Sequence, residues 1–182
     1  MLKKIGIGVG VVLLVLVVVI ATRPAHFRVE RSALINAPPP VVFELINDFH
    51  HWPQWSPWEK LDPGMKKTLS GAPAGTGAQY AWAGNDKAGE GRMTITDSKP
   101  TNLIGIKLEF LKPFAATNQA TFTLTPAAGG TQVQWSMEGE NGFISKAFCM
   151  VVDMDAMVGK DFEEGLGNLN RVAQAAPPSA AR

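Results

Sequence analysis

Cysteine is almost absent from this chain of 182 residues, which contains only Cys149. A single cysteine can form no disulfide within the chain and no zinc cluster with a second thiolate, so the fold must be held by its apolar core. Cys149 lies between Phe148 and Met150, a setting typical of a small buried apolar residue rather than a nucleophile.

An excess of charge of one sign is lacking as well. The chain has 17 lysines and arginines against 16 acidic residues, so its net charge is +1, and only 18% of its residues are charged. Nucleic-acid-binding domains carry basic surfaces, and disordered acidic segments carry many uncompensated carboxylates. Since the chain has neither, we predict a globular protein without a nucleic-acid partner.

Motifs of catalysis and cofactor binding are also missing. We find no glycine-rich phosphate loop, no H-E-x-x-H, no G-x-S-x-G and no paired cysteine motif. The adjacent His50 and His51 cannot share one face of a helix or strand, and no cluster of ligands accompanies them. We therefore predict no metal site and no cofactor, and we assign no catalytic residue. Tyr80, Asp153 and the two histidines are the nearest candidates for proton transfer, but none of them belongs to a catalytic motif. This absence favours binding over catalysis.

The N-terminus carries a long run without charge, over residues 5–21, after two lysines. At 1.5 Å per residue this run would cover about 25 Å, near the lower limit for a hydrocarbon core of about 30 Å. We predict that residues 1–26 form a transmembrane anchor and linker of a single-pass membrane protein. A cleaved signal is the alternative, since Val19 and Ala21 are small, but the run exceeds the usual apolar core of about 7–15 residues. Basic residues flank both ends of the run, so the sequence does not determine on which side of the membrane the rest of the chain lies.

Alternating apolar and polar residues predict a sheet. The first strand is expected over residues 27–36, and the prolines at 38–40 are expected to open a short helix through residue 46. Five further strands are predicted, over residues 79–83, 92–96, 104–110, 120–125 and 132–137. Turn signals separate these five strands, so we expect an antiparallel meander with one apolar face.

Residues 144–172 instead repeat apolar side chains at steps of three or four, the spacing of a helix. This stripe must cover a partner, and the apolar face of the sheet is the obvious one. We predict an α+β fold in which the sheet grips one long C-terminal helix. Gly159, Gly165 and Gly167 weaken the helix and indicate a bend or a close backbone approach.

Residues 49–58 contain three of the five tryptophans. Indole rings bring a large apolar area and one N–H donor each, so they suit either a lid over the core or the mouth of a pocket. The sequence leaves these two alternatives open. A third alternative is an exposed surface that docks a protein partner.

Four motifs together resemble a known family. They are F-R-V-E-R-S from Phe27, A-P-P-P-V-V-F at 37–43, D-F-x-x-W-x-x-W-S-P-W at 48–58 and G-x-D-F-E-x-G-L at 159–166. The chain resembles the START-like superfamily and, within it, the bacterial polyketide cyclase/dehydrase-like (SRPBCC) proteins, over about residues 27–173. The resemblance implies a helix-grip fold, in which a curved antiparallel sheet wraps a long C-terminal helix around an apolar cavity. We expect the tail, residues 174–182, to be disordered.

The predicted function follows from this resemblance and from the missing catalytic motifs. We expect a membrane-anchored START-like domain, in a bacterial cell membrane, that binds a hydrophobic small molecule or lipid between sheet and helix. A polyketide cyclase/dehydrase-like enzyme and a protein-interaction module are the alternatives. The predicted ligand-binding residues are Trp55, Trp58, Tyr80, Trp82, Met93, Ile106, Phe110, Phe122, Trp135, Met154, Val158 and Phe162.

Overall fold

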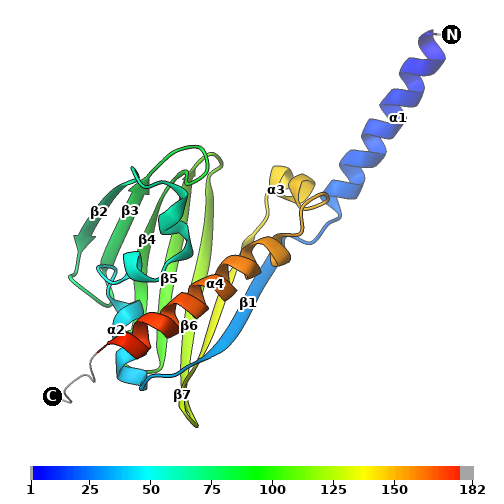
Figure 1. The fold of residues 1–182 in the computed structure, drawn as a ribbon. Coiled ribbons are helices and arrows are strands. Elements are labelled where there is room, and N and C mark those ends of the chain that lie inside the picture. Colours follow the sequence, from blue (N-terminus) through cyan, green and yellow to red (C-terminus); the bar gives the residue numbers. More distant parts are fainter. Residues whose placement is uncertain (1, 177–182) are drawn as a thin grey trace.

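A computed structural model describes residues 2–176 of the chain as a curved sheet crossed by the long C-terminal helix, with the N-terminal helix projecting away from it (Figure 1). The helices are α1 (Leu2–Ala21), α2 (Pro39–Asn47), α3 (Phe143–Phe148) and α4 (Met154–Ala175), with short 3₁₀ helices η1 (Trp52–Gln54) and η2 (Pro57–Leu61). The strands are β1 (His26–Ile35), β2 (Lys66–Gly71), β3 (Ala78–Ala83), β4 (Glu90–Lys99), β5 (Leu103–Lys112), β6 (Ala116–Ala127) and β7 (Gly130–Glu140).

The seven strands form one antiparallel sheet in the order β1-β7-β6-β5-β4-β3-β2. Strands β2 to β7 are a meander, and β1 returns to pair with β7 along its whole length. The predicted α+β class, with a curved antiparallel sheet and a C-terminal helix, is thus confirmed. Strand β2 is not among the predicted strands, because every one of its residues is exposed and its sequence shows no alternation.

Helix α4 lies across the concave face of the sheet and places its apolar stripe in the core. Phe162, Leu166 and Leu169 are buried against the inward residues of β6 and β7, such as Phe122 and Val133. The apolar face of each strand supplies every second residue to this layer, as the period of two predicts. The core is therefore a single layer between the sheet on one side and α4, α2 and the tryptophan-rich segment on the other.

The predicted single helix over residues 144–172 is wrong at one point, because the chain breaks between α3 and α4. The Asp153 side chain accepts a hydrogen bond from the Ala156 backbone N–H at 3.0 Å and so caps the first turn of α4. Val151, counted in the predicted stripe, lies in the break and is 83% exposed. Helical spacing continues across this break by coincidence, and the capping aspartate marks where the packed helix begins.

The tryptophan-rich segment is fastened to the C-terminal end of α2. The last carbonyls of a helix lack partners within the helix. Here the Trp55 indole N–H donates to the Leu45 carbonyl at 3.0 Å, and the Trp52 indole N–H donates to the Ile46 carbonyl at 2.9 Å. Both rings are buried, whereas Trp58 is half-buried, so two of the three tryptophans of this segment do not belong to an exposed surface.

The prediction made for the N-terminal apolar run also needs correction. Helix α1 forms there and extends away from the sheet (Figure 1). Nevertheless, no helix within residues 2–176 is both long and apolar enough to cross a membrane. This finding contradicts the predicted single-pass membrane location.

Candidate functional site

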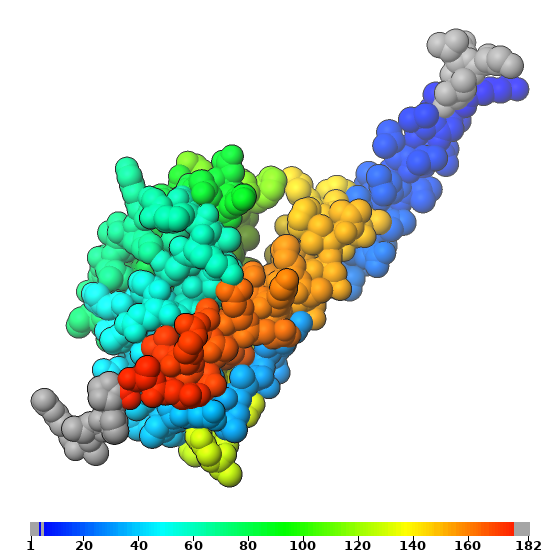
Figure 2. Space-filling view, viewed as in Figure 1, coloured from blue at the N-terminus to red at the C-terminus, as the bar shows by residue number. Residues whose placement is uncertain are grey.

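A cavity of about 400 Å³ lies between the sheet and the N-terminal half of α4. Its floor is built by inward residues of β5, β6 and β7, including Ile106, Ala120 and Met137, and α4 closes it from above with Val158 and Phe162. Figure 2 shows the molecule hollowed beside the orange N-terminal part of α4, where it faces the cyan and green segments. Figure 1 places the curved sheet on the other side of this space.

Ten of the twelve predicted ligand-binding residues line this cavity. They are Trp58, Tyr80, Trp82, Met93, Ile106, Phe110, Trp135, Met154, Val158 and Phe162. The other two, Trp55 and Phe122, are 1% and 0% exposed and lie in the close-packed part of the core instead. The two alternatives for the tryptophan-rich segment, a lid over the core and the mouth of a pocket, therefore each hold for different residues. Trp52 and Trp58 line the cavity, while Trp55 fills the core.

Stacked aromatic rings separate the hollow half of the interior from the filled half. The Trp135 ring lies parallel to Phe162 with centroids 4.1 Å apart, and its other face stacks on Phe122 at 4.7 Å. Gly165 permits this arrangement, because a Cβ there would lie only 2.7 Å from Cζ3 of Trp135. The close backbone approach expected from the helix glycines is thus a contact between Gly165 and an indole ring.

The cavity carries a hydrogen-bonded hydroxyl group on its β3 side. The Tyr80 hydroxyl donates to Glu59 Oε1 at 2.9 Å, and the other Glu59 oxygen pairs with Lys67. Burial raises the pKa of the Tyr80 phenol above its usual range, and the Glu59 carboxylate raises it further. Tyr80 therefore keeps its proton and holds it toward Glu59, a residue whose place at the cavity is not apparent from periodicity because η2 is only five residues long.

The other proposed proton carriers lie elsewhere. His50 is exposed and contacts Asp48, with Nδ1 2.6 Å from Oδ1, and the ring of His51 lies near the same carboxylate. Asp153 is occupied in capping α4. None of these three residues lines the cavity, so Tyr80 is the only one of the four candidates that a ligand there could touch.

The indole N–H groups around the cavity differ in how they are satisfied. Trp82 donates to the Ala88 carbonyl at 3.0 Å, and Trp58 donates to Asp161 Oδ2 at 3.3 Å. Trp135 Nε1, in contrast, is the one buried side-chain nitrogen or oxygen without a hydrogen-bond partner in the part of the chain that the structure describes. Such orphaned donors are rare in folded proteins.

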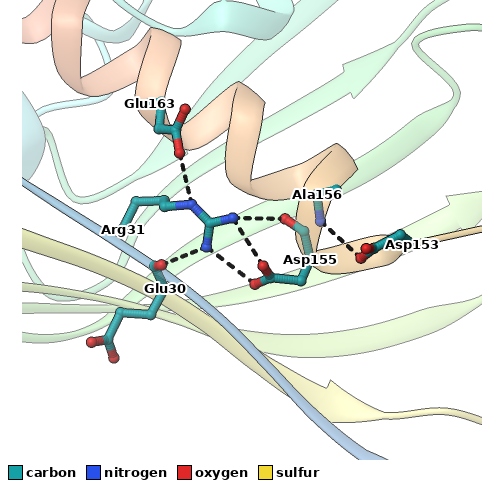
Figure 3. Close-up of polar contacts among 6 residues, drawn as sticks. All are labelled: Glu30, Arg31, Asp153, Asp155, Ala156 and Glu163. Atoms are coloured by element: carbon teal, nitrogen blue, oxygen red, sulfur yellow. Dashed lines mark hydrogen bonds and ion pairs between the residues drawn. The ribbon is translucent and has the colours of Figure 1, made fainter.

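An arginine on β1 holds the N-terminal half of α4 in place over the cavity (Figure 3). Arg31 donates to Asp155 Oδ2 and to Glu163 Oε1, both at 2.9 Å, and to the Glu30 carbonyl at 2.7 Å. Gly159 makes room for the guanidinium, which a Cβ would overlap. The hydrogen bonds to the two carboxylates raise the pKa of Arg31, and the hydrogen bond from Arg31 lowers the pKa of Asp155.

Comparison with known proteins places this geometry in context. The sequence profile of the family described as polyketide cyclase / dehydrase and lipid transport matches residues 26–174. A solved structure from Mesorhizobium loti is similar with a TM-score of 0.61 at 16% identity, over 83% of this chain and 99% of that chain. One from Chromobacterium violaceum has a TM-score of 0.58 at 16% identity, over 84% and 99%.

A protein of the dynemicin biosynthetic locus is also similar, with a TM-score of 0.57 at 21% identity, over 85% of this chain and 49% of that chain. At such identities the likeness shows the fold alone. No curated protein sequence matches the chain.

Proposed function

We propose that this chain, which belongs to the polyketide cyclase / dehydrase and lipid transport family, binds a hydrophobic small molecule or lipid in the cavity under α4. The family is the one that the sequence motifs predicted. The observation that carries the proposal is the cavity itself, which measures about 400 Å³ and is lined mainly by apolar side chains. Small-molecule sites in proteins typically enclose about 300–1,000 Å³.

The composition of the cavity wall supports an adaptable binding site. Five of the seven methionines of the chain line it, namely Met65, Met93, Met137, Met154 and Met157. Methionine side chains are unbranched and polarisable, so they can adjust to ligands of different shape. Met157 is also 48% exposed, which places a flexible apolar side chain where the cavity meets solvent.

The polar groups of the cavity favour binding over catalysis. An acid–base reaction requires a group that can give or take a proton near neutral pH. The only phenol, Tyr80, has a raised pKa and already donates its proton to Glu59. The Tyr80–Glu59 pair therefore supports an orienting role toward a bound molecule.

A pair of isoleucine substitutions on one strand tests the proposal. Ala120 faces the cavity, whereas its neighbour Thr121 points to the other side of the sheet. Ala120→Ile should fill part of the cavity and weaken binding of a dansyl-labelled fatty acid to the full chain, on the order of tenfold. Thr121→Ile adds a side chain of equal size outside the cavity and should leave the affinity unchanged.

The measurement is a fluorescence titration of the probe with each purified protein. If the probe bound to apolar side chains on the outer surface instead of in the cavity, its affinity would be the same for both variants. A difference in affinity between the variants therefore reports binding in the cavity. Absence of saturable binding to the wild-type chain, or equal affinity in the two variants, would contradict the proposal.

A further inference from the structure

Asn118 on β6 is a buried polar side chain that the apolar packing of the cavity does not explain. The alternation of β6 places it on the concave face of the sheet together with Ala120 and Phe122, and it lines the cavity while only 8% exposed. Burying a carboxamide costs free energy unless hydrogen bonds satisfy it. An apolar residue at this position would avoid that cost, so the carboxamide calls for a separate explanation.

The protein itself satisfies this carboxamide poorly. Asn118 Nδ2 lies 3.7 Å from the sulfur of Met137, and a thioether sulfur is a weak acceptor. Because the sulfur can accept a hydrogen bond but cannot donate one, the contact with Met137 places Nδ2 on that side and Oδ1 on the other. The side chain of Asn118 makes no other hydrogen bond within the described residues, so Oδ1 is an acceptor without a donor.

The unpaired oxygen opens on the cavity. Trp135 Nε1 is the one side-chain nitrogen or oxygen of the described residues that is both unpartnered and fully enclosed. Since Asn118 Oδ1 is unpartnered as well, part of its surface is accessible. Its other side is covered by Gly139 on β7, the cross-strand neighbour of Asn118, where a Cβ would overlap Oδ1. The accessible side of Oδ1 therefore faces the cavity that Asn118 lines.

An accessible acceptor in an apolar cavity favours a ligand that brings a hydrogen-bond donor. A cation would need a paired negative charge in this buried place. The carboxylates that line the cavity, Glu59 and Asp161, belong to η2 and α4 and accept hydrogen bonds from Tyr80 and Trp58, whereas Asn118 is neutral. An uncharged donor fits best, and a hydroxyl group is one. An ether or a ketone brings only lone pairs and would leave Oδ1 unpaired.

We propose that the bound molecule carries a hydroxyl group, as an alcohol or a phenol does, and that this group donates a hydrogen bond to Asn118 Oδ1. Asn118 then determines specificity, because an ether of similar shape leaves the buried acceptor without a partner while the hydroxyl compound satisfies it. This inference rests on the proposed function, since it specifies the chemistry of a ligand in the same cavity.

Two aromatic compounds of similar shape, 2-naphthol and 2-methoxynaphthalene, provide the test. Only the first can donate a hydrogen bond, and each can compete with the dansyl-labelled fatty acid for the full chain. Asn118→Leu should lower the ratio of naphthol to methoxynaphthalene affinity by about tenfold, the value of a hydrogen bond to a buried acceptor. Gln119→Leu is the matched control, because it removes the carboxamide of the next residue, which points to the other face of the sheet. It should leave the ratio unchanged.

A second variant covers the case in which leucine does not fit beside Gly139. Asn118→Ala has a smaller side chain than the wild type, so it cannot clash there, and it should lower the ratio in the same way. If both naphthalenes bind but the ratio is the same in wild type and the Asn118 variants, or falls equally in Gln119→Leu, this inference is overturned and the binding function stands. If neither naphthalene nor the fatty acid binds, the binding function itself fails.

Discussion

Replacing Gly165 by alanine should destabilise the protein at the point where α4 meets Trp135. The new Cβ would lie 2.7 Å from Cζ3 of Trp135 and 3.2 Å from Cδ of Pro57, and the first of these is closer than carbon atoms approach in folded proteins. The indole cannot tilt away freely, since Phe122 and Phe162 stack on its two faces. Either the ring or the helix must therefore move.

The size of the effect follows from two opposing terms. Adding a methyl group to a close-packed core costs about 1–3 kcal/mol. Alanine in place of glycine inside a helix stabilises the folded state by about 1 kcal/mol. We expect Gly165→Ala to lower the free energy of unfolding by about 0–2 kcal/mol, and the displaced Trp135 should also weaken probe binding in the cavity.

A second glycine of the same helix isolates the contact. Gly167 is exposed, and a Cβ there would meet nothing within 4 Å. Gly167→Ala should therefore stabilise the protein by up to about 1 kcal/mol. The difference between the two variants cancels the helix term and measures the clash alone, about 1–3 kcal/mol.

Urea-induced unfolding followed by tryptophan fluorescence gives both free energies. In thermal unfolding the difference corresponds to about 2–4 °C per kcal/mol for a chain of this size. If the two variants have equal stability, α4 does not approach Trp135 as closely as described. The assignment of Trp135 and its stacked rings as the boundary between the filled part of the interior and the cavity would then be wrong.

Two further predictions concern titrating groups. The folded state raises the pKa of Tyr80 above its ordinary value of 10.0, so the protonated phenol stabilises the fold fully below pH 10. This stabilisation is lost as the pH rises above 10, and Tyr80→Phe should remove the loss. Tyr80 is the only tyrosine, so tyrosinate absorbance should appear upon unfolding rather than near pH 10, and a normal titration of the folded chain would refute this. Arg31→Gln should lower stability at neutral pH, where Asp155 is ionised, and the difference from wild type should shrink as the pH falls below 3.8. A difference that is constant down to acid pH would show that Arg31 stabilises α4 by packing alone.

Local patterns in the sequence are enough to predict the class of fold and most of the cavity wall. Alternation in β5, β6 and β7 and helical spacing in α4 fix which side chains turn inward, because each side chain's direction follows from the local backbone period. This is why ten of the twelve predicted ligand-binding residues line the cavity. Strand β2 escaped prediction for the same reason, since both of its faces are exposed and no alternation marks it.

The sequence patterns do not show where the interior is filled and where it is hollow, because this depends on packing between distant parts of the chain. Trp55 and Trp58 lie three residues apart with similar sequence signals, yet Trp55 is in the core and Trp58 is at the cavity. The unpartnered N–H of Trp135 was equally invisible, because the residues that surround its ring belong to other elements, such as Phe122 on β6 and Phe162 on α4. Whether inward side chains touch depends on the separation between helix and sheet. That separation is set by contacts between residues distant in sequence, such as Gly165 with Trp135 and Arg31 with Asp155, and no local period encodes it.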